Sequence, residues 1–513
     1  MQNYSENTKR IAKNTLMLYG RMLFSMVVSL YTSRVILNAL GVEDYGIYNA
    51  VGGFVTIFSI ISSALSSAIS RFLTFELGRC DFIRLKKSFS TSLFVLVALS
   101  ILVIFVAETV GLWFLNNKMI IPADRLYAAQ WVYQASVVSF VLGLVSVPYN
   151  ALIISHERMG MFAYIGIIQV LLKLAVVLFV AYSSWAFDRL IIYSLLLVIV
   201  GLLMQSIYWI YCTRNFEESH LELSFDKQLW KEMSSFAGWN FVGCSAGVLK
   251  DQGVNILINM FLGPVVNAAR GIAVTVNNTV GGFANNFMVA LNPQITKTYA
   301  SRDFEYCYSL VERGARFSFF ILLTIALPLF LETDFVLALW LKDYPIHTVN
   351  FVRLILVLSM VDMLSNTLIT LQLATGNIKT YQIVVGGILL LNLPLSYLCL
   401  WLELPPESTL IIAITLSAVA MIARLMLLKR MTGISVRNYF KNVLFRVFIV
   451  TVAACICPAI VYLCMSYGWG RVVIVGTMSL ISSSLSIYYL GCSQEERNFV
   501  LSKVLAIRNK VYR

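Results

Sequence analysis

Charged residues are scarce in this sequence: they occupy 13% of 513 positions, whereas hydrophobic residues occupy 59%. The mean hydropathy is correspondingly high, at +0.79. Because about a quarter of the residues in soluble globular domains are charged, this composition excludes that class. The sequence therefore predicts an all-α polytopic membrane protein.

Residues that carry common enzyme chemistry are also few. The three histidines are far apart in sequence, at His156, His220 and His347, and the nine cysteines lie mostly in apolar stretches. No metal-binding spacing, Walker A loop or Asp-x-Asp motif is present. We therefore expect no metal, no cofactor and no ATP hydrolysis, and a membrane glycosyltransferase or polymerase is the disfavoured alternative.

Long apolar runs dominate what is present, and they predict fourteen membrane spans. The basic cluster at Lys9, Arg10 and Lys13 precedes a run too long for a signal-peptide core, so we expect this run to be an anchor. The predicted spans occupy residues 13–40, 45–75, 88–115, 126–154, 161–184, 188–213, 231–261, 266–295, 309–331, 348–374, 380–402, 407–428, 443–465 and 472–491.

The net charge of +13 is distributed unevenly over the predicted loops. Few basic residues fall in outer loops, whereas inner loops and tails are rich in them, which predicts that both termini are cytoplasmic. The C-terminal basic residues are expected to lie against anionic lipid headgroups, so membrane lipids rather than nucleic acids are the expected partners of this charge. The outer-loop basic residues are Lys118, Arg125, Lys342 and Arg471.

An internal repeat links the two halves of the chain. A shift of 222 residues places Leu40-Gly41 on Leu262-Gly263 and Asp81-Phe82 on Asp303-Phe304, and a shift of 219 places Lys173 on Asn392. The simplest interpretation is two pseudo-symmetric six-helix lobes with a substrate between them. The expected divisions are an N-lobe at 1–213, a cytoplasmic linker at 214–230, a C-lobe at 231–430, and two further helices with a basic tail at 431–513.

Two predicted spans carry polar faces. Asn278, Asn285 and Asn292 recur every seven residues in the eighth span, so they share one side of a helix. Lipid cannot satisfy a row of carboxamides, so this side is expected to meet protein or water, and lining of a cavity is favoured over close packing. In the second span, Thr56, Ser63 and Ser70 form a similar stripe, for which packing and cavity lining remain equally plausible.

Several ionisable residues are embedded in predicted spans, where each costs on the order of 2.5–3.5 kcal/mol. Lys173 lies mid-span and cannot reach an interface, which makes it the strongest candidate for a substrate contact. Asp251 and Asp362 either neutralise nearby cations or couple transport to H⁺ or Na⁺. The other embedded cations are Arg21, Arg34, Lys250, Arg270 and Arg353, of which Arg34, Arg270 and Arg353 could instead extend to an outer interface.

A short signature covers the end of the first predicted span and the start of the second: it reads RVILNALGVEDYGIY and occupies residues 34–48. It resembles the first hairpin of the polysaccharide-transporter branch of the multidrug/oligosaccharidyl-lipid/polysaccharide exporter superfamily. This resemblance rests on Leu40, Gly41, Asp44, Tyr45, Gly46 and Tyr48, and a layout of twelve core spans plus two is common in the branch.

The resemblance implies a MATE-like fold and a Wzx-like flippase. Such a protein moves an undecaprenyl-pyrophosphate-linked O-antigen, capsule or exopolysaccharide unit across the bacterial inner membrane, beside a polysaccharide polymerase and a chain-length regulator. The embedded cations would then bind the diphosphate, and the asparagine stripe would suit sugar hydroxyls. The alternatives are a MATE-type drug or metabolite antiporter and a peptidoglycan lipid-precursor flippase.

Overall fold

The computed structural model describes residues 2–56, 59–117, 121–122, 124–183, 188–220, 226–341 and 344–498. Throughout these ranges the regular structure is helical and no strand forms. The chain divides into two compact units, of which unit 1 comprises Met1–Ser245 and Thr296–Asp303, and unit 2 comprises Ala246–Ile295 and Phe304–Arg513. The lobe boundaries at 213, 231 and 430 that the sequence repeat suggests are not tested by this division and remain predictions.

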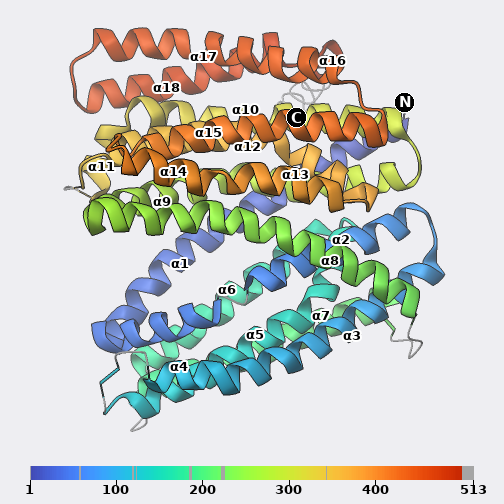
Figure 1. Ribbon diagram of the computed structural model, residues 1–513, viewed down its shortest axis with the longest axis vertical. Helices are drawn as coiled ribbons and strands as arrows, with labels where there is room; N and C mark the ends of the chain where they lie inside the picture. The colour runs from blue at the N-terminus through green and yellow to red at the C-terminus, as the bar shows by residue number, and fades with distance from the viewer. Residues whose placement is uncertain are drawn as a thin grey trace, which may run out of the picture. The chain divides into compact units, whose positions relative to one another are not determined.

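Unit 1 is built on helices from the first half of the chain (Figure 1). Within it α1 packs along α6, and α5 packs against α3 and α7. Most of its helices are long enough to cross a hydrocarbon core of about 30 Å. The helices are α1 (Gln2–Thr56), α2 (Ser59–Gly78), α3 (Phe82–Val106), α4 (Leu112–Asn117), α5 (Leu126–Ser155), α6 (Met159–Tyr182), α7 (Arg189–Asn215) and α8 (Lys227–Val248), with a π-helical turn at Ala107–Gly111 between α3 and α4.

Unit 2 contains most of α9 and the helices that follow it, with α12 packed between α10 and α15 and with α17 against α18. Its interior contains a cluster of buried apolar residues from α9, α10, α11, α12 and α15. The helices are α9 (Val254–Ala300), α10 (Phe304–Leu331), α11 (Thr333–Leu341), α12 (Thr348–Thr375), α13 (Lys379–Leu390), α14 (Asn392–Trp401), α15 (Ser408–Thr432), α16 (Val436–Tyr439), α17 (Phe445–Cys464) and α18 (Trp469–Ser486), with π-helical turns at Leu249–Gly253, Phe440–Leu444 and Ile487–Gly491.

Two glycines bend the long helices in the same way. Gly41 in α1 has φ 82° and ψ 169°, and Gly263 in α9 has φ 79° and ψ −178°. This region of backbone space is essentially restricted to glycine. The glycines that the 222-residue shift aligns therefore share a conformation that their flanking residues could not adopt without strain.

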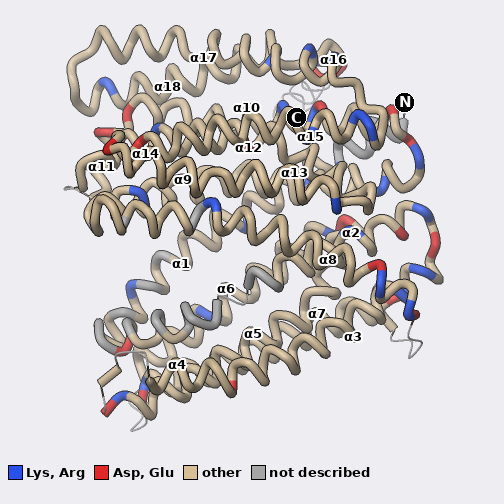
Figure 2. The backbone as a smooth tube through the Cα atoms, viewed as in Figure 1, with Lys and Arg blue, Asp and Glu red and all other residues tan. Residues whose placement is uncertain are grey.

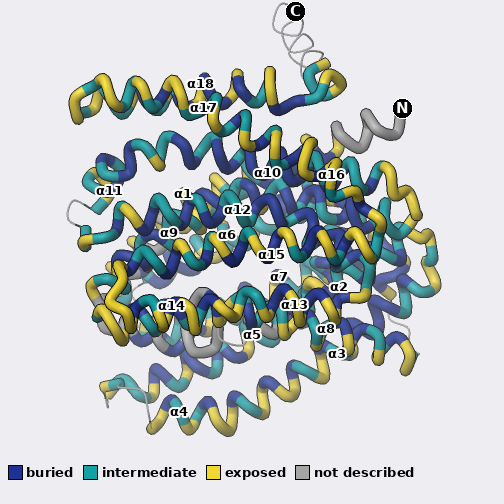
Figure 3. The backbone as a smooth tube through the Cα atoms, turned by 45° about the horizontal axis from the view of Figure 1, so that its top comes forward, coloured by how far each residue is buried: buried dark blue, intermediate teal, exposed yellow. Residues whose placement is uncertain are grey.

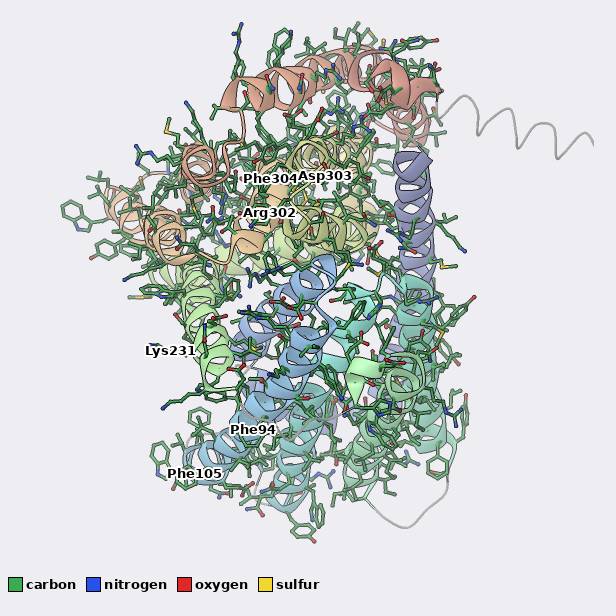
Figure 4. All side chains as sticks on the ribbon, turned by 90° about the vertical axis from the view of Figure 1, so that its right-hand side faces the viewer. Phe94, Phe105, Lys231, Arg302, Asp303 and Phe304 are labelled. Atoms are coloured by element: carbon green, nitrogen blue, oxygen red, sulfur yellow. The ribbon has the colours of Figure 1, made fainter. Side chains whose placement is uncertain are left out.

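The same shift also relates the turns that end these two segments. Cys80 and Arg302 both adopt positive φ, at 58° and 61°. The next helices begin at Phe82 and Phe304, and Figure 4 labels the second of these turns at Arg302, Asp303 and Phe304. Helix ends and backbone conformations thus match at the spacing that the sequence repeat predicts.

Replacement of Gly41 by alanine is expected to lower the free energy of unfolding by about 2 kcal/mol, because alanine must adopt a conformation that glycine alone tolerates. No atom lies within 4 Å of the added methyl group, so the cost is conformational rather than steric. Thermal unfolding of the detergent-purified protein measures this difference. Gly20→Ala is the matched control, because Gly20 is an ordinary helical residue with equal space around it. Equal melting of Gly41→Ala and wild type would contradict the prediction.

Eleven helices among the described residues are long and apolar enough to cross a membrane, and together they identify a multi-pass membrane protein. The predicted total of fourteen is not confirmed. The three predicted spans outside the eleven are those at 45–75, 231–261 and 266–295, and two of these carry the serine and asparagine stripes that lower hydropathy. They are nevertheless largely helical, within α1, α2, α8 and α9.

Large apolar side chains cover much of the exposed surface. On α3, Phe94 and Phe105 are 62% and 65% exposed, and their spacing of eleven residues places them on one helix face (Figure 4). Exposed residues alternate with buried ones along α17 and α18 (Figure 3). Most charged residues lie near helix ends, with long uncharged stretches between them (Figure 2). This is the surface expected of helices that face lipid.

Candidate functional site

Arg21 in unit 1 lies against α6. Its guanidinium carbon is 4.3 Å from the centre of the Phe162 ring, a cation–π geometry. A methyl group at Gly166 would come within 2.7 Å of the Arg21 Cδ atom, so the absence of a side chain there allows the arginine to approach. The structure therefore holds the Arg21 cation on the α6 face that contains Phe162 and Gly166.

Lys173 lies on the same face of α6, seven residues after Gly166. Its position is two turns further along, or about 10.5 Å of helix axis. Lys173 is exposed and forms no ion pair with a described residue. The structure thus brings two predicted cations, Arg21 and Lys173, onto one side of α6. The ammonium of Lys173 is accessible and lies near the middle of this helix.

Arg34, by contrast, lies thirteen residues after Arg21 in α1, which turns the two side chains to nearly opposite sides of that helix. Arg34 is exposed and is not brought to the α6 face by the sequence spacing. Its role as a substrate contact therefore stays a prediction, and it does not depend on the α6 face.

Lys250 in unit 2 is buried, with 8% exposure, and sits in the π-helical turn Leu249–Gly253. Its Nζ atom is 3.8 Å from Oδ2 of Asp362 in α12 and 3.4 Å from Oγ of Ser417 in α15. A π-helical turn changes the register of a helix, and such turns are frequent at functional sites. The structure therefore pairs two predicted site residues, whereas the side chain of Asp251 lies outside the described residues.

A broken helix adjoins this turn. Helix α13 ends at Leu390 and α14 begins at Asn392, whose Nδ2 atom donates to the carbonyl oxygen of Lys250 at 3.4 Å. Sequence reasoning did not assign Asn392 or Ser417 to a site. The repeat contained one signal, since the 219-residue shift places Lys173 of α6 on Asn392.

The asparagine stripe on α9 divides between exposed and bonded positions. Asn278 and Asn285 are exposed, whereas Asn292 accepts a hydrogen bond from Thr370 Oγ1 of α12 at 2.9 Å. Asn277, beside the stripe, accepts a hydrogen bond from Ser359 of the same helix. Two of the three predicted carboxamides are therefore accessible, and the third is attached to α12.

Two other embedded arginines have different surroundings. Arg270 of α9 is buried, with 4% exposure. Arg353 of α12 donates to Asp334 at 3.0 Å and to the carbonyl oxygen of Phe330 at 3.1 Å. Arg353 thus joins α12 to α10 and α11, a structural contact.

Arg125, predicted only as an outer-loop charge, connects three segments of unit 1. Its Nε atom donates to Asp44 at 2.8 Å, and its Nη1 atom donates to Asp188 at 2.5 Å. Hydrogen bonding to Asp44 and Asp188 raises the pKa of Arg125, against the effect of burial. Asp44 belongs to the signature at 34–48, so this contact gives the acidic position of that signature a structural role.

At another place in unit 1, Glu157 accepts from two cations. Its carboxylate is 2.8 Å from both Arg10 Nε and Lys297 Nζ, and its carbonyl oxygen accepts from Asn14 Nδ2 at 3.3 Å. The Glu157 side chain is only 2% exposed. This group, the Glu157 cluster, joins the start of α1 to the end of α9, whose residues from Thr296 onward belong to unit 1.

No group of three metal-ligating side chains occurs within the described ranges. The accessible groups of the candidate site are the Lys173 cation, the carboxamides of Asn278 and Asn285, and the carboxylate of Asp362. The cation and the carboxamides bind anions and hydroxyls through charge and hydrogen bonding.

Residues 8–300, more than half of the chain, match the family described as polysaccharide biosynthesis protein. The chain is 23% identical over 501 residues to the uncharacterized membrane protein EpsK of Bacillus subtilis (strain 168). The alignment covers 94% of this chain and 95% of that protein. Its fold is similar to a MATE protein crystallised in the straight conformation, with a TM-score of 0.69, 13% identity, and coverage of 83% of this chain and 97% of that one. A MOP superfamily transporter from Pyrococcus furiosus gives a TM-score of 0.67 at 12% identity, over 81% and 95% of the two chains.

Proposed function

This chain belongs to the polysaccharide biosynthesis protein family, and on that premise we propose that it is a flippase for a lipid-linked oligosaccharide. The cargo is an undecaprenyl-pyrophosphate-linked unit of O-antigen, capsule or exopolysaccharide. The protein moves this unit from the inner to the outer leaflet of the bacterial inner membrane, with both of its own termini in the cytoplasm. The observation that carries the proposal is the placement of Arg21 and Lys173 on one face of α6.

The chemistry of that cargo fits the accessible groups. A diphosphate is a dense anion, which ammonium and guanidinium groups bind through charge-assisted hydrogen bonds. The exposed carboxamides of Asn278 and Asn285 can donate to and accept from sugar hydroxyls. The polyprenyl tail needs no protein site, because it can remain in the bilayer while the head group crosses.

Transport in this proposal alternates access between an N-lobe at 1–213 and a C-lobe at 231–430, with spans 431–513 appended. Arg34, Lys250, Arg270 and Asn292 are proposed as further substrate contacts. The Lys250–Asp362 pair, with Asp251, is proposed to balance charge or to couple the cycle to H⁺ or Na⁺. A polysaccharide polymerase and a chain-length regulator are the proposed protein partners.

A MATE-type drug or metabolite antiporter is the second candidate, since the fold is similar to that of MATE proteins. At 13% identity this similarity establishes the fold and leaves the substrate open. A peptidoglycan lipid-precursor flippase is the remaining alternative, and it shares the proposed diphosphate chemistry.

The test is deletion of the gene in its own host, followed by complementation. The proposal predicts that surface polysaccharide disappears, that the lipid-linked unit accumulates on the cytoplasmic leaflet, and that the intact gene restores both. Deletion that leaves surface polysaccharide unchanged and raises drug sensitivity would instead establish the antiporter. Arrested growth with accumulated peptidoglycan precursor would establish the precursor flippase.

A further inference from the structure

A cavity of ≈620 Å³ opens where α12 and α15 begin in unit 2. This volume is within the range of about 300–1,000 Å³ that is usual for small-molecule sites. Four apolar and four polar residues line it, and most of the lining area is apolar. The apolar residues are Ile346, Leu404, Pro405 and Ile411, and the polar residues are His347, Asn350, Glu407 and Ser408.

The carboxylate of Glu407 is hydrogen-bonded through only one of its oxygens. Its Oε1 atom accepts from His347 Nδ1 at 2.7 Å and from Asn350 Nδ2 at 2.9 Å. Its Oε2 atom is buried and has no hydrogen-bond partner in the described part of the chain, and the same is true of Ser408 Oγ. Burial alone would raise the pKa of Glu407, but the hydrogen bonds from Asn350 and His347 lower it, so the group is ionised at neutral pH.

An ionised oxygen held away from water without a donor is costly, by about 1–3 kcal/mol or more. Buried polar atoms in this state are few in folded proteins, and each requires an explanation. Glu407 and Ser408 both line the cavity, so a ligand there can supply the missing donor once their side chains turn toward it.

The internal repeat provides a comparison within the same molecule. Arg125 and Asp188 of unit 1 precede α5 and α7, and His347 and Glu407 precede α12 and α15 at positions 222 and 219 residues further along. In unit 1, Arg125 donates to both carboxylate oxygens of Asp188, at 2.5 Å and 3.4 Å. In unit 2, His347 takes the place of Arg125. A histidine ring nitrogen supplies one donor where the guanidinium supplies two side by side, so Glu407 Oε2 is left without a donor.

We infer that this cavity binds a sugar residue through Glu407 and Ser408. One hydroxyl of the sugar donates to Glu407 Oε2 while a neighbouring hydroxyl exchanges a hydrogen bond with Ser408 Oγ. The apolar C–H face of the ring lies against Ile346, Leu404 and Pro405. A bare cation could use the two oxygens but not this apolar wall.

The inference rests on the proposed function, in which the glycan emerges on the outer side of the membrane, and we propose that the cavity opens on that side. The site would then hold a sugar of the exported unit after its diphosphate has crossed. It is separate from the candidate diphosphate contacts on α6, which contain no carboxylate.

The test uses the full-length protein in detergent and three neutral probes, the methyl α-glycosides of glucose, galactose and mannose. Saturation-transfer NMR is expected to detect binding of at least one of them to wild type. Glu407→Gln should weaken that binding about tenfold or more, the effect of losing a hydrogen bond to a charged group, whereas Ser408→Ala removes a neutral hydrogen bond and should weaken it about fivefold. His347→Arg should abolish it, because the arginine fork would occupy Oε2 as Arg125 occupies Asp188.

Thr415→Ala is the control, because Thr415 is exposed on α15 outside the cavity and its hydroxyl donates to the carbonyl oxygen of Ile411 in its own helix. Thermal unfolding of each variant verifies that it is folded. No binding of any glycoside to wild type, or equal binding by wild type and His347→Arg, would overturn the inference. Binding of Na⁺ or Ca²⁺ that requires Glu407, without glycoside binding, would overturn it in favour of a cation site.

The outcome is distinguishable from failure of the proposed function. Restored polysaccharide export in the complementation test, without glycoside binding, would reject this site and retain the flippase. Glycoside binding that depends on Glu407, with export unaffected by gene deletion, would retain the site and reject the flippase.

Discussion

Replacing Lys173 by methionine is expected to reduce surface polysaccharide by more than about tenfold, since loss of a hydrogen bond to a charged group costs about 1.5–3 kcal/mol. Methionine preserves the length and apolar stem of the side chain and removes only the ammonium. Because Lys173 is exposed on α6 and pairs with no described acid, no structural ion pair is lost. The measurement is polysaccharide at the cell surface, normalised to the amount of protein in isolated membranes.

Lys173→Arg should retain part of the activity, because the charge survives while its geometry changes. Lys173→Ala should match the methionine variant. Lys227→Met is the control, since Lys227 is exposed at the start of α8, away from the α6 face. Wild-type export by Lys173→Met at normal abundance would remove this residue from the substrate site.

Replacing Glu157 by glutamine is expected to lower the free energy of unfolding by about 3 kcal/mol, the lower part of the range for breaking a buried ion pair. The carboxylate is buried, with 2% side-chain exposure, and it neutralises both Arg10 and Lys297. Glutamine has the same shape and leaves both cations without their counter-charge. The melting temperature of the purified protein should fall accordingly.

Arg10→Gln is the matched comparison for this cluster. The Arg10 side chain is 50% exposed, whereas that of Lys297 is 23% exposed. Because exposed ion pairs contribute about 0–1 kcal/mol, Arg10→Gln should cost much less than Glu157→Gln. If both variants melt with the wild type, the Glu157 cluster contributes nothing measurable to stability.

The helices and their repeat were predictable because each has a local cause. Apolar runs of the right length predict helices in lipid, and Gly41 and Gly263 lie where a bend requires glycine. The sequence was less informative at the polar segments. Serine in α2 and asparagine in α9 reduce the hydropathy by which apolar spans are recognised, charged residues do the same around α8, and so these three helices are missing from the apolar spans.

The candidate site was predictable residue by residue but not as a set of contacts. The free-energy cost of placing an ionisable side chain within a membrane span identified Arg21, Lys173, Lys250 and Asp362 as candidates. Their partners depend on the register between helices far apart in sequence, which spacing within one helix does not reveal. The π-helical turn at Lys250 changes that register further, so its proximity to Asp362 and Ser417 could be seen only in the structure.

The Glu157 cluster has a consequence for how the protein is made. Lys297 follows Glu157 by 140 residues, so at about 5–20 residues per second the ribosome needs roughly 7–28 s to supply it. During that interval the carboxylate has Arg10, which precedes it in the chain, as its available cation. Residues 1–245 therefore cannot complete unit 1 by themselves, and its maturation must wait for Thr296–Asp303, which is synthesised after the first segment of unit 2, Ala246–Ile295.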